Sequence, residues 1–310
     1  MRFAAYKISY ALLALWIIVS LTFLLLKNIP GDPFAQEQSI NPAIHQALLS
    51  HYRLTDPWHV QYIHYLKAVF MWDLGPSYIY RGQSVNQIIS ENFPISAVLG
   101  LEALSLAVFF GMGGGILAAK TKGSRWDKAI LFLSALGVSI PSFILAALLQ
   151  YTLAYRYPIF PIARWGTLSQ SILPALSLAA LPAAFIFRLT RTNLFDVLQH
   201  DYIKTARAKG LSDLSILFKH ALRNAILPVL GYLGPLAANI LTGSFVVEKI
   251  FAIPGLGFWF ISSVSTRDYP VIMGTTIFYS LLLLTFVLLA DLLGAWIDPR
   301  LRNTYSQEFT

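Results

Sequence analysis

Residues 129–155 have the sequence AILFLSALGVSIPSFILAALLQYTLAY, a run of 27 residues without a charged side chain. A helix needs about 20 mostly apolar residues to cross the roughly 30 Å hydrocarbon core of a bilayer, where its backbone hydrogen bonds must be satisfied internally. This stretch therefore predicts a membrane-spanning helix. Of the 310 residues in the chain, 56% are hydrophobic and 12% are charged, against about 25% charged in a typical soluble domain. The composition argues against a soluble globular protein.

Five further windows are apolar and long enough to cross, so we expect an all-α polytopic membrane protein with six transmembrane helices. The six windows are residues 8–26, 95–119, 129–155, 165–187, 224–247 and 269–296. The first should be a retained span, because the turn sequence NIPGDP at 28–33 follows it in place of a small-residue cleavage site. Two acids, Glu102 and Asp291, fall inside windows and are expected near the ends of their helices.

The distribution of basic residues predicts the orientation, since Lys and Arg in short loops are retained in the cytoplasm. With the N-terminus inside, the inner segments hold 15 Lys and Arg in 66 residues, and the outer segments hold 8 in 101. Both termini are therefore expected in the cytoplasm. The expected parts of the chain are an N-terminus with the first span (1–27), an extracytoplasmic segment (28–94), a five-helix core (95–302) and a cytoplasmic tail (303–310).

The composition also limits the chemistry. The chain has no cysteine, which excludes disulfides and thiolate catalysis, and it has no Gly-Lys dipeptide for a Walker A phosphate loop. The net charge of +8 indicates orientation in a membrane rather than binding to nucleic acid. Four of the six histidines lie in the extracytoplasmic segment, where solvated side chains are favoured over a metal site. We expect no catalytic residue, cofactor or metal.

Two glycine-containing stretches predict packing features. The sequence GMGGG at 111–115 contains a Gly-x-x-x-Gly pair within an expected span, which favours close helix packing. The sequence IPGLGFWF at 253–260 is too short to cross and too apolar for water. It is interpreted as a re-entrant or interfacial segment, with an aromatic anchor at the membrane interface as the equal alternative.

The cytoplasmic segment 193–223 predicts two amphipathic helices separated by a break. The first should cover 193–209 and end at Gly210, and the second should begin after Ser212 as its N-cap and run until Pro228. Such helices either lie on an anionic membrane surface or insert into the groove of a partner protein, and the pattern alone allows both. With no nucleotide site in the chain, the segment suggests a conduit whose energy comes from another subunit.

At this segment the sequence resembles the membrane subunits of binding-protein-dependent ATP-binding-cassette importers. The stretches DYIKTARAKGL at 201–211 and HALRNAILP at 220–228 are similar to that family's "EAA" loop, which docks into a cleft of the ATPase. Lys204-Thr205-Ala206 stand where the general pattern has Glu-Ala-Ala, and 18 residues separate Gly210 from Pro228. Both departures resemble the dipeptide and oligopeptide branch, and more narrowly its oligopeptide permease B subunits. The shorter stretches that agree with it are PGDPF (30–34), DLGPS (73–77), NFPIS (92–96), IPSF (140–143), PGLG (254–257) and DPR (298–300).

The resemblance implies a type I importer fold with both termini inside. It also implies a heterodimer with a second permease subunit, two ATPase subunits in the cytoplasm, and an extracytoplasmic peptide-binding protein. ATP-driven closure of the ATPases would then act on segment 193–223. The residues expected to dock the ATPase are Ala206, Lys209, Gly210, Leu211 and Leu214.

For the translocation path, small and polar residues of the third to fifth spans are the candidates: Ser139, Ser142, Asn239 and Thr242. Helix packing explains each of them equally well. The cargo implied by the resemblance is oligopeptides, with dipeptides, nickel complexes or another small solute as alternatives. A self-sufficient secondary transporter or channel remains a competing hypothesis, as does an export permease or membrane scaffold that uses the same loop.

Overall fold

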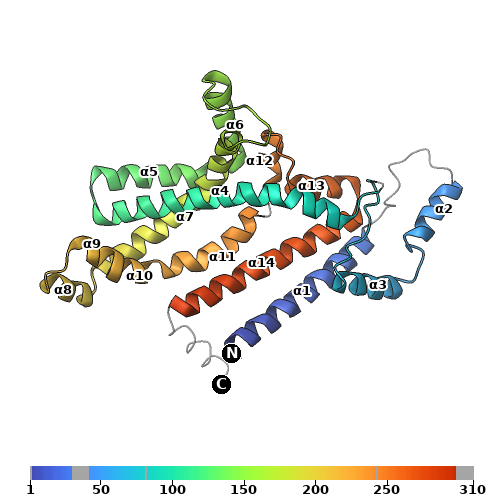
Figure 1. The fold of residues 1–310 in the computed structure, drawn as a ribbon, viewed down its shortest axis with the longest axis horizontal. Coiled ribbons are helices and arrows are strands. Elements are labelled where there is room, and N and C mark those ends of the chain that lie inside the picture. Colours follow the sequence, from blue (N-terminus) through green and yellow to red (C-terminus); the bar gives the residue numbers. More distant parts are fainter. Residues whose placement is uncertain (1, 30–41, 81, 242, 298–310) are drawn as a thin grey trace.

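The structure, a computed structural model, describes residues 2–29, 42–80, 82–241 and 243–297, which form helices and one isolated β-bridge between Pro76 and Ser84. Long helices run side by side along the molecule (Figure 1). The short helices α2 (Pro42–His51) and α3 (Trp58–Phe70) lie at one end, and the loop that contains α8 (Asp201–Ala208) lies at the other (Figure 1). The all-helical prediction is confirmed for the described residues.

Four helices of the described chain are long and apolar enough to cross a membrane unbroken. They are α1 (Arg2–Asn28), α4 (Val85–Lys120), α7 (Leu168–Leu198) and α14 (Tyr269–Ile297). Two further pairs of helices satisfy the same criteria only when each bent pair is taken as one span, which gives up to six spans.

The charge-free stretch 129–155 does not form one helix, so the prediction of a single straight span there is wrong. Helix α5 (Arg125–Ser139) ends before Ile140, and α6 (Ser142–Leu149) continues into the π-helix η1 (Gln150–Arg156). The two halves meet at 106°. The cause is Pro141, which lacks an N–H and favours an extended residue before it; Ile140 has φ −93° and ψ 116°.

The expected fifth span, 224–247, also differs. Its bent pair consists of residues 213–225 followed by α11 (Leu227–Leu241), with an angle of 55° between them beside Pro228. Helix α11 ends six residues before the predicted end, and α12 (Phe245–Ile250) and α13 (Leu256–Thr266) are separate short helices. The 11 residues of α13 are too few to cross, as expected for the segment 253–260.

Helix α4 begins ten residues before the predicted start of the second span. The Ser84 hydroxyl accepts a hydrogen bond from the backbone N–H of Gln87 at 3.1 Å and so caps the helix, and Pro94 lies inside it without ending it. Glu102 therefore lies near the middle of α4 and not near an end, as was expected. Asp291 pairs with Lys7 of α1 at 2.9 Å.

Helices α4 and α7 pack closely at the predicted glycine pair. A Cβ on Gly111 would lie 2.8 Å from the carbonyl oxygen of Ala183, and one on Gly115 would lie 2.6 Å from the Cβ of Thr190. Only glycine allows this approach, so the expected packing role of 111–115 is confirmed for Gly111 and Gly115.

Two buried acids hold the short helices between the spans. Glu248 of α12 accepts a hydrogen bond from the Ser96 hydroxyl of α4 at 2.8 Å, and the Ser96 oxygen accepts one from the Leu256 N–H at 2.9 Å, at the start of α13. Asp268, just before α14, accepts hydrogen bonds from the Ser77 hydroxyl and, at 3.1 Å, from the Tyr78 N–H. Both carboxyl side chains are fully buried.

Candidate functional site

The cytoplasmic loop is built from more elements than the sequence predicts. The expected helix 193–209 is interrupted at 199–200, because α7 ends at Leu198 and α8 begins at Asp201. After Gly210 the chain forms α9 (Asp213–Ser215), the π-helix η2 (Ile216–Ala221) and α10 (Leu222–Ala225). A π-turn within an α-helix is uncommon and frequently marks a functional segment.

Gly210 forms the break that the sequence predicts. Its φ is +76°, in the left-handed region, and the Gly210 N–H donates to the Arg207 carbonyl at 2.9 Å to close the end of α8. No atom lies within 4 Å of an added Cβ, so conformation rather than space favours glycine here. The predicted N-cap is also confirmed, since the Ser212 hydroxyl accepts a hydrogen bond from the Ser215 N–H.

One face of the loop packs against the spans. Buried side chains of α8 and η2 meet the ends of α4 and α7 in one apolar cluster, which contains Ala119, Leu194, Ile203, Ala206, Ile216, Leu217, Ala221 and Ala225. Ala206 is 7% exposed and therefore lies inside this cluster. Its expected place on the docking surface does not agree with the structure, and the role of Ala206 is to join α8 to η2.

The opposite face exposes large apolar side chains. Leu211 is 41% exposed, Leu214 63% and Phe218 58%. Leu214 and Phe218 are four residues apart and so share one side of the helix. These three residues form what we call the exposed loop face. Sequence reasoning included Phe218 in the apolar pattern of the second helix but not among the docking residues, because the sequence did not show that Leu217 instead would be buried.

Charged side chains surround the exposed loop face. Lys209, a predicted docking residue, is exposed next to Gly210. The Lys204 ammonium donates a hydrogen bond to the exposed Asp201 carboxylate at 2.8 Å, and this bond holds the pKa of Asp201 below its ordinary value. The loop thus presents an apolar strip with basic neighbours.

An ion pair that sequence reasoning missed supports the base of the loop. Arg191 of α7 donates to both carboxylate oxygens of Asp127 on α5, from Nε at 2.7 Å and from Nη2 at 2.9 Å. Asp127 also accepts from the Gly123 N–H at 2.9 Å, and its side chain is 3% exposed. The pair is 64 residues apart in sequence, and no local pattern indicates it.

The predicted path residues fall on separate elements. Ser139 ends α5 and Ser142 begins α6, so the two flank the 106° break. Asn239 is an exposed residue of α11, and Thr242 lies outside the described residues. The structure assigns no path, and these residues stay predictions. Within the described residues, no group of three His, Cys, Asp or Glu side chains could hold a metal ion.

The comparisons with known proteins agree with this architecture. The chain is 48% identical over 92% of its length to the dipeptide transport system permease protein DppB of Bacillus subtilis (strain 168), covering 93% of that protein. It is 38% identical over 97% of its length to the oligopeptide transport system permease protein OppB of Escherichia coli (strain K12), covering 99% of it.

The fold resembles a chain of the MetNI methionine ABC transporter in its inward-facing conformations. The TM-score is 0.50 at 18% identity, over 69% of this chain and 96% of that one. Residues 111–303 match the family described as binding-protein-dependent transport system inner membrane component. With the apolar helices and the extent of identity to DppB and OppB, this match shows that the chain belongs to that family and is a permease subunit of a binding-protein-dependent transport system.

Proposed function

We propose that this permease subunit carries short peptides into the cell and couples to a separate ATPase subunit through the exposed loop face of Leu211, Leu214 and Phe218. The observation that supports the coupling is the two-sided construction of the loop. One side is buried against α4 and α7, and the other exposes apolar side chains that are unlike those of an ordinary solvated loop. A partner bound to the exposed side would therefore act on two spans directly.

The proposed docking chemistry is an apolar groove with acidic edges. Leu214 and Phe218 would fill the groove, as amphipathic helices do in other complexes, and Lys209 would pair with an acid at its edge. Gly210 would set the angle between α8 and the following helix. In this proposal the ATPase subunits, two for each transporter, hydrolyse ATP, and this chain performs no chemistry.

The other partners are proposed from the family relationship. A second permease subunit would complete the path as a heterodimer, and a soluble peptide-binding protein would deliver cargo to the side of α2 and α3. The excess of basic residues in segments 119–128 and 188–223 supports a cytoplasmic position for the loop and for both termini. The proposed division of the chain is 1–27, 28–94, 95–302 and 303–310, with the beginning of α4 within the second part.

Two cargo classes remain in the proposal. Oligopeptides are the first, and dipeptides are a second candidate favoured by the higher identity to DppB. Uptake of dialanine and pentaalanine by proteoliposomes that contain all subunits separates them. Equal transport of both supports oligopeptides, whereas loss of pentaalanine uptake with retained dialanine uptake supports dipeptides.

Co-purification tests the coupling. Burial of a leucine contributes about 1.5–3 kcal/mol, so Leu214→Asp should reduce the amount of ATPase recovered with the tagged chain by about tenfold or more. Phe70→Asp is the matched control, because Phe70 is 93% exposed on α3 at the opposite end. Recovery of the ATPase with Leu214→Asp at the level of wild type would contradict the proposed docking face.

A further inference from the structure

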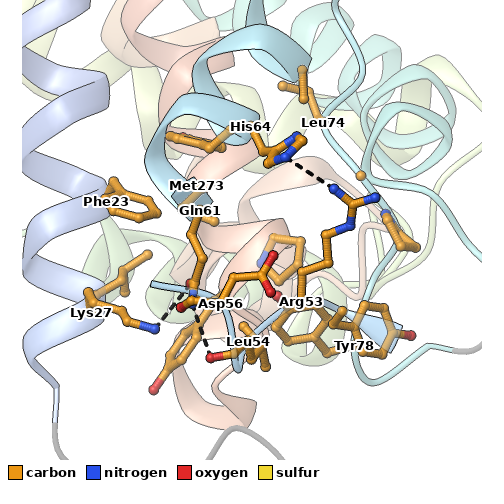
Figure 2. Close-up of a pocket in the computed structure, with 18 of the residues that line it drawn as sticks. Phe23, Lys27, Arg53, Leu54, Asp56, Gln61, His64, Leu74, Tyr78 and Met273 are labelled. Carbon is orange, nitrogen blue, oxygen red and sulfur yellow. Dashed lines mark hydrogen bonds between the residues drawn. The ribbon is translucent and has the colours of Figure 1, made fainter. Parts of the chain in front are cut away.

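A cavity of about 910 Å³ lies where α1 ends and α14 begins, under the chain that joins α2 to α3. Figure 2 shows Phe23 and Lys27 of α1 on one side and Arg53 with Tyr78 on the other. We call this space the α1–α14 cavity. Its volume is within the range of ligand sites.

The position of the cavity points to the surface of a bilayer. Phe23 and Lys27 belong to the last turns of a candidate span, and Met273 belongs to the first turns of another. Aromatic and basic side chains at span ends are typical of the level at which hydrocarbon meets lipid headgroups. A ligand at this depth would have an apolar part beside Phe23 and Met273 and a polar part toward α2 and α3.

The cations that line the cavity have no carboxylate partner among the described residues. The Lys27 ammonium donates to the Gln61 side-chain oxygen at 3.1 Å, and Arg53 Nη1 lies 3.1 Å from His64 Nε2. Gln61 is itself held, because its amide donates to the backbone oxygens of Leu54 and, at 2.6 Å, Asp56. Both positive charges are thus presented by neutral side chains and stay available for an anion.

The cavity also presents a negative charge. The Asp56 carboxylate, half-buried, forms no hydrogen bond or ion pair with any other described residue, and Figure 2 shows it between Lys27 and Arg53. Arg53 has φ +54°, a conformation that is strained for a side-chain-bearing residue and is found at ligand clamps. A carboxylate between two cations, over an apolar floor, is complementary to a zwitterion with an apolar body.

We propose that the α1–α14 cavity binds the headgroup of a phospholipid that carries both a phosphate and a primary ammonium, as phosphatidylethanolamine does. The phosphate accepts from the guanidinium of Arg53, whose planar donors suit phosphate oxygens, and Lys27 adds a second positive charge. The ammonium donates to Asp56, and the first carbons of the acyl chains lie against Phe23 and Met273.

Native mass spectrometry of the full chain, purified with its partner subunits, tests the proposal. The probes are short-chain phosphatidylethanolamine, phosphatidylglycerol, which lacks the ammonium, and trialanine, which is a zwitterion without phosphate. Wild type should bind the ethanolamine lipid about tenfold more tightly than the glycerol lipid, since one charge-assisted hydrogen bond separates them.

The variants assign each charge. Arg53→Gln should weaken both lipids about tenfold, whereas Arg53→Lys should retain part of the affinity. Asp56→Asn should lower the affinity for the ethanolamine lipid to that for the glycerol lipid and leave the latter unchanged. Lys67→Gln is the control, because Lys67 is an exposed residue of α3 outside the cavity lining.

Three results would overturn the proposal. These are equal binding of the two lipids by wild type, unchanged lipid preference in Asp56→Asn, and displacement of the ethanolamine lipid by trialanine, which would assign the cavity to peptides. The Asp56→Asn comparison is made within one variant and therefore does not depend on the stability of Arg53→Gln.

Discussion

Replacing Arg191 by Met should destabilise the protein by about 3 kcal/mol, because the buried Asp127 carboxylate loses both of its guanidinium hydrogen bonds. The side chain of Asp127 is 3% exposed, and the donor that remains to it is the Gly123 N–H. The expected loss is at the low end of the range for broken buried pairs, since the pair lies near the ends of α5 and α7 rather than in the centre of the bundle.

Thermal unfolding of the purified protein in lipid nanodiscs measures this loss, which corresponds to a Tm decrease of roughly 5 to 9 °C for a chain of this length. Arg191→Lys should recover part of it, because an ammonium keeps the charge but cannot form the two parallel hydrogen bonds. Asp127→Asn combined with Arg191→Met should be less destabilising than the two single changes added together.

The control is Lys204→Met, which breaks the exposed pair between Lys204 and Asp201. Their side chains are 68% and 94% exposed, and an ion pair in water contributes little, so the Tm should not change. If Arg191→Met lowers the Tm no further than Lys204→Met does, the reasoning that burial gives the Asp127 pair its strength is refuted.

Three further substitutions test other parts of the structure. Gly210→Val should cost about 1–2 kcal/mol in the left-handed region and uncouple ATP hydrolysis from uptake, whereas Gly210→Asn should be tolerated; normal uptake by the valine variant at normal abundance in the membrane would count against a role of this turn in coupling. Gly115→Ala should destabilise by about 1–3 kcal/mol, because its Cβ meets Thr190, while Gly113→Ala, with no atom within 4 Å of the Cβ, should stabilise by about 0.5–1 kcal/mol; Tm values in nanodiscs decide, and equal effects would disprove the packing argument. Glu248→Ala should cost about 2 kcal/mol or more, because the buried Ser96 hydroxyl loses its acceptor; protease resistance of the 243–268 segment measures this, and resistance equal to wild type would contradict the argument.

Local signals in the sequence predicted the features that depend on a few neighbouring residues. The apolar windows gave the approximate positions of the spans, and the glycine at 210 with the serine at 212 gave the break and the cap of the loop. The Gly111 and Gly115 pair was predictable because a four-residue spacing of glycines has one common structural use in apolar helices.

The features that were missed depend on contacts between distant parts of the chain or on residues given too little weight. Hydropathy alone made 129–155 one span, although Pro141 was visible in the sequence and divides it. The burial of Ala206 and Leu217, and the exposure of Phe218 beside them, follow from how α8 meets η2, which no single helix pattern contains. The partnership of Asp127 with Arg191 depends on the packing of α5 against α7.

Helix α4 has a mechanical consequence. Its 36 residues make a rod about 54 Å long, compared with a hydrocarbon core of about 30 Å. At its first turn, the Asn86 side chain accepts from the Leu74 N–H at 2.9 Å and donates to the Trp72 carbonyl at 2.8 Å, and at its last turn Ala119 packs into the loop cluster. The rod works as a lever, in which a tilt of about 10° about one end displaces the other by about 9 Å. Motion that begins at the loop therefore arrives at the far side of the bundle without any relay between them.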